Sequence, residues 1–354
     1  MRHGRAGLGN VGGVQLTWRN GLDSSEAAEV MGLLDKTEKA DGVAPVGEHV
    51  ILRLKAHRDL TRQIEPVQAD VRSEHFVLRD THTDALIGYA HLDTEHEGTT
   101  GQLVAELAVD PDHRRKGAGT RLVEALLERA ELSLDPAPDT AKLRIWSHGE
   151  LPGAVRLAER YGFSRPRELW RMGRDLAEPE LPEVELREGV RLRTFRPDRD
   201  EAAVVAVNHP AFSWHPEQGG MTEQDLRVKE REDWFDPAGF FLAVDERDQL
   251  LGFHWTKVHP DGTGEVYVVG VDPDAQGGGL GRSLTVAGLR HLHDTGCPRV
   301  MLYVEADNAP AVSVYRRLGS RSGTWTCNSD GDRRRAVRHR NSRSVPPEGC
   351  ASAY

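Results

Sequence analysis

The spacing of apolar and polar residues predicts the same run of helices and strands twice along the chain. Each half has an amphipathic helix candidate next to aspartate residues, followed by two neighbouring strands. A glycine-rich turn, a second helix, a third strand and a short helix come next in both halves. The helix candidates are residues 23–36 and 198–207, and the strands are residues 74–80, 85–92, 141–147, 239–246, 249–258 and 299–306. Mixed strands with flanking helices indicate an α/β layer fold, with an α+β type of mixed sheet.

Direct comparison of the two halves supports a duplicated domain. Residues 105–127 align with residues 267–289 at a constant offset of 162, and residues 154–163 align with residues 311–320 at an offset of 157. Two matches in the same order predict tandem domains of ordinary size. We therefore expect a disordered leader at 1–17, an N-terminal domain at 18–174, a linker rich in Pro and Glu at 175–189, a C-terminal domain at 190–319 and a tail at 320–354.

Charge and cysteine content exclude several classes of function. The formal net charge is −10, whereas a nucleic-acid-binding protein would favour a basic face. No run of about 18 apolar residues occurs, so we expect no membrane span, and the first residues lack the apolar segment of a signal peptide. Cys297, Cys327 and Cys350 form neither a disulfide framework nor a metal-ligand spacing. We expect a cytoplasmic monomer with no metal.

The glycine-rich turn is the most informative motif. In both halves the sequence V-D-P ends a strand and is followed by glycines and a helix. A tight turn onto a helix N-terminus directs backbone N–H groups toward one point, where the helix dipole favours an anion such as a pyrophosphate. The spacing matches neither the P-loop nor the dinucleotide-binding fingerprint. A plain tight connection is the structural alternative, but recurrence of the turn behind the same V-D-P favours a phosphate site.

The motifs V-D-P-x-x-[QR]-x-x-G-x-G and N-x-x-A-x-x-x-Y-x-x-L-G resemble those of the Gcn5-related N-acetyltransferase (GNAT) family. The resemblance implies that acetyl-CoA is the co-substrate, with its pyrophosphate on the turn and its pantetheine along the preceding strand. In the first half the implied residues are Leu107, Ala108, Val109, Arg115, Lys116, Gly117, Ala118, Gly119 and Thr120. In the second half they are Val269, Gly270, Val271, Gln276, Gly277, Gly278, Gly279, Leu280, Gly281, Arg282, Tyr303, Asn308, Ala309, Pro310, Ala311, Val312 and Ser313.

Acetylation of an amine needs a proton acceptor for the amine and a proton donor for the departing thiolate. Glu265 begins the motif strand of the second half, and the resemblance places Tyr315 near the CoA sulfur. The same offsets applied to the first half give Leu103 and Ala158, which cannot transfer protons. Glu265 could instead be a solvated strand end and Tyr315 a packing residue. Their joint loss from the first half favours catalysis in the second domain, with acetyl-CoA binding but no turnover in the first.

A closer resemblance, which runs through loops of both halves, is to tandem members of the family that acetylate the cysteine amine of cysteinyl-glucosaminyl-inositol. It implies a small-molecule acceptor bound by Glu48, Glu217, Lys257 and Glu265. Because Glu48 belongs to the first domain, the acceptor is expected to lie between the domains. Without the resemblance, Glu48 and Glu217 would be ordinary surface acids. Two alternatives stay open: another small amine or a protein N-terminus as acceptor, and a non-catalytic acyl-CoA-binding protein.

The tail departs from the resemblance after Gly319. Residues 320–354 contain seven arginines and three carboxylates, with little apolar content, so we expect disorder. Either the tail is a genuine basic segment able to touch RNA or acidic surfaces, or a frame error near Trp325 has replaced a final strand. The second hypothesis arises because T-C-N-S-D-G-D can be encoded so that a neighbouring frame reads V-Q-F-R-R. If the tail is genuine, the C-terminal sheet would lack one strand.

Overall fold

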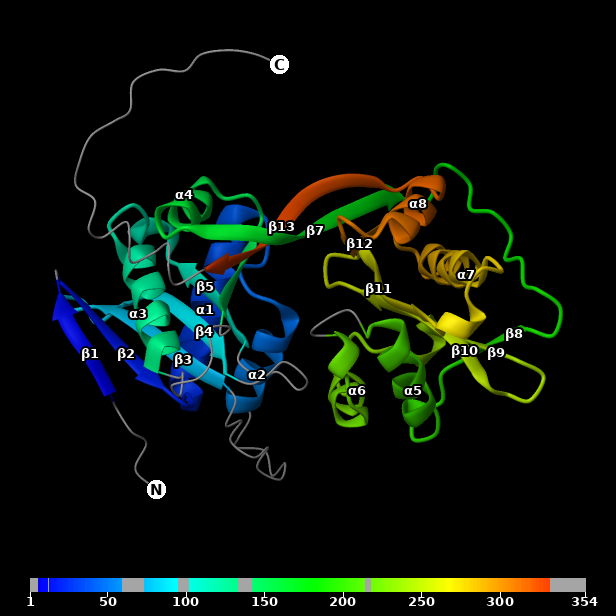
Figure 1. Cartoon of the computed structure of the whole chain (residues 1–354), viewed down its shortest axis with the longest axis horizontal. Coiled ribbons are helices and arrows are strands. Elements are labelled where there is room, and N and C mark those ends of the chain that lie inside the picture. Colours follow the sequence, from blue (N-terminus) through cyan, green and yellow to red (C-terminus); the bar gives the residue numbers. More distant parts are fainter. Residues whose placement is uncertain are drawn as a thin grey trace, which may run out of the picture. The chain divides into compact units, whose positions relative to one another are not determined.

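The computed structural model describes residues 6–11, 13–58, 73–94, 102–132, 142–213 and 218–331 (Figure 1). The chain forms two compact units. The N-terminal unit runs to Pro166, and the C-terminal unit runs from Arg167 to Thr326. The division falls earlier than the boundary expected at residue 174, because strand β7 (Phe163–Asp175) pairs with β12 (Arg299–Glu305) through the residues from Leu169 to Asp175.

The N-terminal unit is a mixed sheet covered by helices, and its strand order is β1-β2-β3-β4-β5-β6. All neighbours are antiparallel except β5 and β6. Helix α3 packs on one face through Leu122 and Leu126, whereas α1 and α2 cover the other. The elements are β1 (Ala6–Val11), β2 (Val14–Arg19), α1 (Ser24–Asp41), α2 (Glu48–Arg58), β3 (Ser73–Asp80), β4 (Leu86–Asp93), β5 (Gln102–Val109), α3 (Ala118–Leu132), β6 (Lys142–His148) and α4 (Pro152–Arg160).

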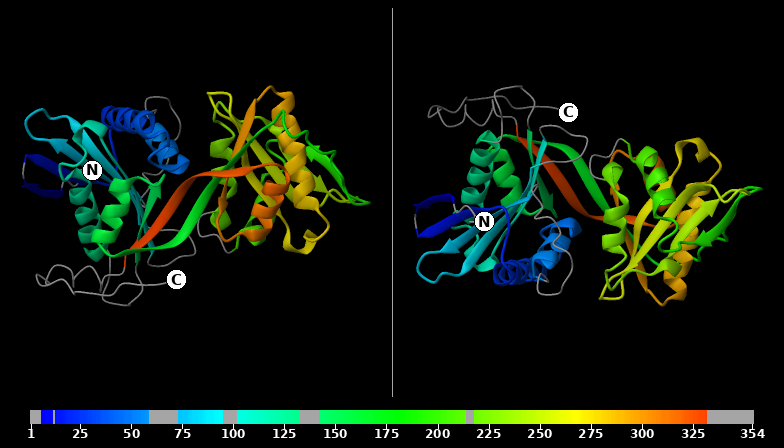
Figure 2. Two further views of the ribbon diagram at one scale, coloured as in Figure 1. Left: turned by 90° about the horizontal axis from the view of Figure 1, so that it is seen from above. Right: turned by 90° about the horizontal axis from the view of Figure 1, so that it is seen from below.

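The C-terminal unit repeats this plan with the strand order β7-β12-β11-β10-β9-β8 (Figure 2). Only β11 and β12 are parallel neighbours. Helix α7 packs against one face, and α5 and α6 pack on the opposite face. The remaining elements are β8 (Arg191–Thr194), α5 (Glu201–Ala211), α6 (Glu223–Lys229), β9 (Phe240–Val244), β10 (Leu250–Val258), β11 (Gly264–Val271), α7 (Leu280–Asp294) and α8 (Ala309–Arg317). Strand β13 (Arg321–Gly331) begins in this unit, and its residues from Cys327 onward belong to the N-terminal unit.

Two expectations about the chain ends are wrong. The segment 1–17 is not a simple leader, because β1 and most of β2 form there, and Val14 and Trp18 pack against the core of the sheet. The tail is not structureless throughout, since residues 321–331 form β13, which is next to β7 in the strand order. Backbone pairing stabilises a strand even where the side chains show little alternation. Residues 332–354 lie outside the described part of the chain.

The aspartate of each V-D-P motif has a structural role that explains its recurrence. Asp110 accepts a hydrogen bond from the Asp112 amide at 2.8 Å, and Asp272 accepts one from the Asp274 amide at 2.9 Å. Both aspartates therefore cap a short 3₁₀ turn that includes the following proline. The turn redirects the chain from the end of the motif strand toward the glycines.

One glycine contact predicts a measurable stability difference. A Cβ on Gly288 of α7 would lie 2.0 Å from Cε1 of His254, a fully buried ring that donates to the Leu284 carbonyl at 2.7 Å. Gly288→Ala should therefore destabilise the protein by about 1–3 kcal/mol through overpacking. Gly32→Ala is the matched control, because a Cβ there meets no atom within 4 Å in the middle of α1. It should gain about 0.5–1 kcal/mol. Urea unfolding of both variants checks the pair, and equal stabilities would contradict the packing.

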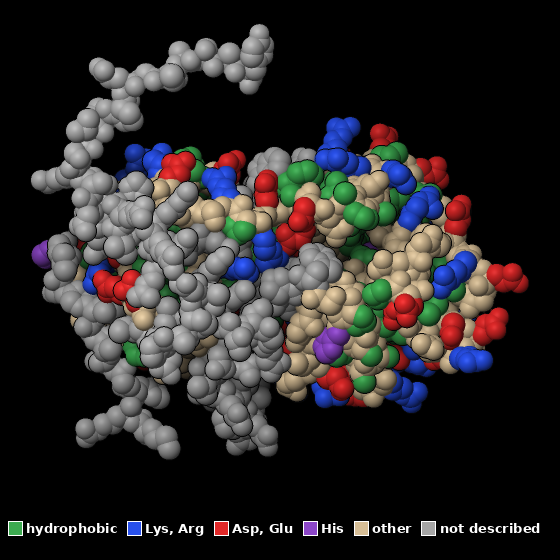
Figure 3. Space-filling view, viewed as in Figure 1, with side chains coloured by type: hydrophobic (Ala, Val, Ile, Leu, Met, Phe, Trp, Pro, Cys, Tyr) green, Lys and Arg blue, Asp and Glu red, His purple; other side chains and the backbone are tan. Residues whose placement is uncertain are grey.

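On the coloured part of the surface in Figure 3, Lys and Arg side chains are interspersed with Asp and Glu. Within the described residues, none of the helices is both long enough and apolar enough to cross a lipid bilayer.

Candidate functional site

Each glycine turn leaves open space in front of a helix N-terminus. Gly279, with φ of 77°, is the N-cap of α7, and as a glycine it offers no side chain to the first amides of this helix. Gly277, with φ of 92°, and Gly117, with φ of 91°, have the same left-handed backbone. A Cβ on any of these three glycines would meet no atom within 4 Å. This is the geometry expected of an anion cradle, the name used below for each turn, and glycine reaches this conformation at low cost.

At each cradle, a polar side chain forms a hydrogen bond to the backbone of the motif strand. Gln276 donates to the Val271 carbonyl at 3.3 Å, and Arg114 donates to the Val109 carbonyl at 3.2 Å. Gln276 therefore corresponds to Arg114, and the range expected for the first cradle began one residue too late. The offset of 162 residues between the two halves, applied to Gln276, also gives Arg114. Arg114 also forms a bidentate ion pair with Asp41, with both N–O distances at 2.7 Å.

The strands beside each cradle separate toward their carboxyl ends. In the C-terminal unit the pairing of β11 with β12 ends at Val266 and Leu302, although β11 continues to Val271 and β12 to Glu305. A β-bulge at Tyr267 shifts the register between β10 and β11. A bulge disrupts the local ladder and leaves a backbone amide available. The expected pantetheine residues Val269, Gly270 and Val271 all lie in this separated part of β11.

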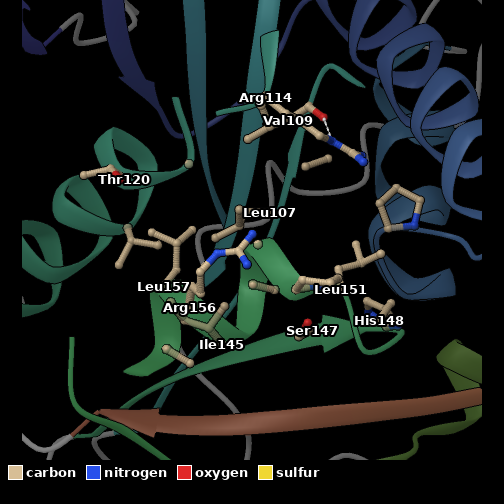
Figure 4. A pocket seen from close by; sticks show the side chains of 18 of the residues that line it. Leu107, Val109, Arg114, Thr120, Ile145, Ser147, His148, Leu151, Arg156 and Leu157 are labelled. Carbon is tan, nitrogen blue, oxygen red and sulfur yellow. Dashed lines mark hydrogen bonds between the residues drawn. The ribbon is translucent and has the colours of Figure 1, made fainter. Parts of the chain in front are cut away.

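In the N-terminal unit, the separation of β5 and β6 opens into a cavity of about 1120 Å³. Figure 4 shows Leu107 and Val109 of β5, Arg156 and Leu157 of α4, and His148 of β6 around it. Most of the residues expected to bind CoA in this half line the cavity, namely Leu107, Ala108, Val109, Arg115, Gly117, Gly119 and Thr120. The other two do not line it, since Lys116 donates to the Asp112 carbonyl at 3.0 Å and Ala118 is buried in the core.

Glu265 is a buried carboxylate with a defined partner. Its side chain is 9% exposed, and Oε2 lies 2.7 Å from Nε2 of His259. Glu265 pairs directly with Lys257 across β10 and β11, so the two side chains are neighbours on one face of the sheet. The Lys257 ammonium in turn lies 4.4 Å from the ring centroid of Trp234. The sequence interpretation missed His259, which had no motif to mark it.

Tyr315 lies in α8 and packs against the apolar cluster that includes Val266 of β11. Burial raises its pKa to about 12, so the phenol keeps its proton throughout the physiological range. Asn308, one of the residues expected to bind CoA, caps α8 by accepting from the Ala311 amide at 3.2 Å. Tyr303, another of the expected CoA-binding residues, is 42% exposed on the part of β12 that follows its pairing with β11.

The residues expected to bind the acceptor do not all belong to one unit. Lys257 and Glu265 belong to the C-terminal unit, whereas Glu48 is the first residue of α2 in the N-terminal unit. Glu217 lies outside the described residues. Their joint use by one ligand therefore stays a prediction.

The strand pairing of β10 with β11 and of β4 with β5 changes which residue of the first half corresponds to Glu265. Lys257 pairs with Glu265, and the matching pair in the N-terminal unit is Asp93 with Val104. Because the β4–β5 register runs without the bulge, the counterpart of Glu265 is Val104 and not Leu103. The counterpart remains apolar, and Ala158 still replaces Tyr315. Two ionisable residues of the N-terminal unit that contact each other, Glu106 and His148, have no counterpart in the sequence prediction, and His148 lines the cavity.

Comparison with known proteins agrees with this geometry. Residues 208–320 match the acetyltransferase (GNAT) family model, and residues 72–165 match an acetyltransferase (GNAT) domain model. The mycothiol acetyltransferase of Saccharopolyspora erythraea is 73% identical over 292 residues, which are 81% of this chain and 96% of the relative. That of Actinosynnema mirum is 55% identical over 306 residues, which cover 86% and 95% of the two chains.

Solved structures support the tandem fold. A GCN5-related N-acetyltransferase from Sphaerobacter thermophilus superposes with a TM-score of 0.62 at 23% identity, over 89% of this chain and 95% of the other. A tandem GNAT protein from the clavulanic acid biosynthesis pathway gives 0.63 at 18% identity, over 90% and 98%.

Proposed function

This chain belongs to the mycothiol acetyltransferase family of tandem GNAT proteins, and we propose that it moves the acetyl group of acetyl-CoA to the cysteine amine of cysteinyl-glucosaminyl-inositol. It is an acetyl-CoA-dependent acetyltransferase of mycothiol biosynthesis. We assign the chemistry to the C-terminal unit. The observation that carries this assignment is the buried Glu265–His259 pair, which begins the motif strand that leads to the α7 cradle.

The proposed reaction uses groups of β11, α7 and α8. The cradle of α7 holds the pyrophosphate of acetyl-CoA. Glu265 accepts a proton from the acceptor amine, directly or through a water molecule, and His259 keeps its carboxylate oriented. The amine nitrogen attacks the thioester carbonyl, and a backbone amide near the bulge in β11 stabilises the negative oxygen. The C–S bond then breaks, and the thiolate receives the proton of Tyr315. The resulting phenolate takes the second proton of the new amide nitrogen, and Glu265 releases its proton to solvent.

Recognition of the acceptor is proposed to involve the polar and aromatic face beside Glu265. Lys257 offers hydrogen bonds to sugar or inositol hydroxyls, and the rings of Trp234 and Tyr267 lie 4.4 and 5.3 Å from its ammonium. Glu48 and Glu217 are proposed to bind the same acceptor. We further propose that the enzyme is a cytoplasmic monomer that needs no metal. The N-terminal cavity is proposed to bind acetyl-CoA as well.

A panel of acceptors tests the function. Purified chain with acetyl-CoA should acetylate cysteinyl-glucosaminyl-inositol with a kcat/KM at least about 100-fold above that for glucosamine, free cysteine or a peptide N-terminus, because those lack part of the proposed contacts. Product mass identifies the acetylated nitrogen. If the chain prefers a peptide or another amine, that compound and not cysteinyl-glucosaminyl-inositol is its acceptor. Calorimetric binding of acetyl-CoA without transfer to any member of the panel would favour a non-catalytic acyl-CoA-binding protein.

A further inference from the structure

A row of buried ionisable residues crosses the N-terminal sheet where the C-terminal sheet is apolar. Equivalent positions in the two sheets follow from their strand pairing, because Gly88 pairs with Val109 in one unit and Gly252 pairs with Val271 in the other. The row in the N-terminal unit is His75, His91 and Glu106, and the matching row in the C-terminal unit is Phe240, Trp255 and Val268. All three polar residues are buried. Burial of charge without partners is costly, so the polar row needs contacts that offset this cost.

Glu106 has those contacts, and they lead to the cavity. Its Oε2 accepts from the Gly47 amide at 2.5 Å and lies 3.2 Å from Nε2 of His148. Burial alone raises the pKa of the Glu106 carboxyl, but the neighbouring His148, His49 and the Gly47 amide bring it down to about 2. Glu106 is therefore ionised at neutral pH and can fix the orientation of the His148 ring.

His148 lies at the end of the cavity where an acyl group would be. The pairing of β5 with β6 ends at Glu106 and Trp146, and His148 follows on the separated part of β6. The cavity extends from Thr120, beside the cradle, to His148 on its opposite side (Figure 4). A CoA with its pyrophosphate on the cradle and its pantetheine along Leu107 would bring the thioester to this end. In the C-terminal unit the corresponding residue is Glu305, which is ion-paired with Arg167, so the arrangement belongs to the first unit.

A metal site is the competing interpretation of the same cluster. Single ligand atoms of His49, His91 and Asp93 lie within 4.8 Å of one another. However, Nη1 of Arg53 lies 3.1 Å from Nε2 of His91 and forms an ion pair with Asp93. The guanidinium thus supplies the positive charge that a metal ion would bring. Acid–base chemistry by His148 is the interpretation that uses the cavity as well.

We propose that the N-terminal unit is a second catalytic site, in which His148, oriented by Glu106, is the general base for hydrolysis of an acyl-CoA thioester. The proposal rests on acetyl-CoA binding in the N-terminal cavity. A water molecule loses a proton to His148 and its oxygen bonds to the carbonyl carbon. The C–S bond breaks, and the CoA thiolate takes the proton back from the imidazolium. The products are the free acid and CoA, and no other reactant is needed.

Acceptor-free release of thiol from acetyl-CoA tests this site in the full chain. Glu265→Gln and Tyr315→Phe are introduced together to disable the proposed C-terminal chemistry. This double variant should still release thiol faster than buffer alone. Adding His148→Asn should lower the release by at least about tenfold, since a general base contributes roughly 100- to 10,000-fold. Glu106→Gln should also lower it. His293→Asn, which changes a half-exposed histidine of α7, is the matched control and should have no effect.

Two further measurements separate catalysis from folding. Calorimetry should show that His148→Asn keeps its affinity for acetyl-CoA, and His148→Asn in the otherwise unchanged chain should still acetylate the acceptor. The proposal is overturned if the double variant releases thiol only at the buffer rate, or if His148→Asn leaves the release unchanged. The function assigned to the C-terminal unit is measured by acceptor acetylation, so the two proposals fail independently.

Discussion

Glu265→Gln lowers kcat for acetyl transfer by about 100- to 10,000-fold, the range expected for loss of a general base. Glutamine has the shape of glutamate and can still hydrogen-bond to His259, which lies 2.7 Å from the carboxylate in the native protein. It cannot accept a proton from the acceptor amine. Because Glu265 does not contribute to the cradle of α7, the affinity for acetyl-CoA should be nearly unchanged. Steady-state kinetics with calorimetry of acetyl-CoA binding separates the two effects.

Asp261→Asn is the matched control for this substitution. Asp261 is an exposed carboxylate of the same β10–β11 connection, where it accepts from the Thr263 amide at 2.9 Å. Its loss should leave kcat within the error of the assay. A wild-type kcat for Glu265→Gln, or an equal fall for Asp261→Asn, would remove Glu265 from the mechanism.

Gly279→Asp raises the acetyl-CoA concentration needed for turnover, and lowers kcat/KM for acetyl-CoA by about 100-fold. The aspartate tolerates the left-handed backbone better than most residues, and its side chain enters the open space where the pyrophosphate would bind. Like charges in contact cost several kcal/mol, and about 2.8 kcal/mol is already 100-fold. Gly279→Asn has the same size without the charge, so it should have a much smaller effect.

Gly117→Asp places the same charge in the other cradle. Gly117 has φ of 91° and equally open surroundings, so the two substitutions are sterically alike. In our account the N-terminal cavity is not needed for acceptor acetylation. Gly117→Asp should therefore abolish one binding event in calorimetry while acetylation continues.

The duplication and the phosphate cradles could be predicted from the sequence because their signals are local. The glycines must follow the strand at once, and the aspartate of V-D-P must cap its own turn, as Asp272 does. Strands and helices with clear periodicity were correctly predicted for the same reason. Strands β1 and β13 were missed, since glycine, arginine and serine obscure the alternation there while backbone pairing still forms a strand.

Features that depend on pairing between strands could not be predicted. The bulge at Tyr267 displaces every earlier residue of β11 by one position relative to β5, so a constant offset chose Leu103 where the register gives Val104. Glu106 and His148 are 42 residues apart in the chain, and nothing in either local sequence indicates that they meet. His259 was missed for the same reason, because only the hairpin between β10 and β11 brings it to Glu265.

The claim that acetyl transfer takes place in the C-terminal unit is tested most directly by the ratio of kcat/KM for acetyl-CoA between Gly117→Asp and Gly279→Asp, with acceptor acetylation as the readout. We expect a ratio of about 100 in favour of Gly117→Asp, in line with the cost of one like-charge contact. A ratio near one, or a larger loss in Gly117→Asp, would show that the reaction depends on the N-terminal cradle and would contradict the assignment of Glu265 and Tyr315.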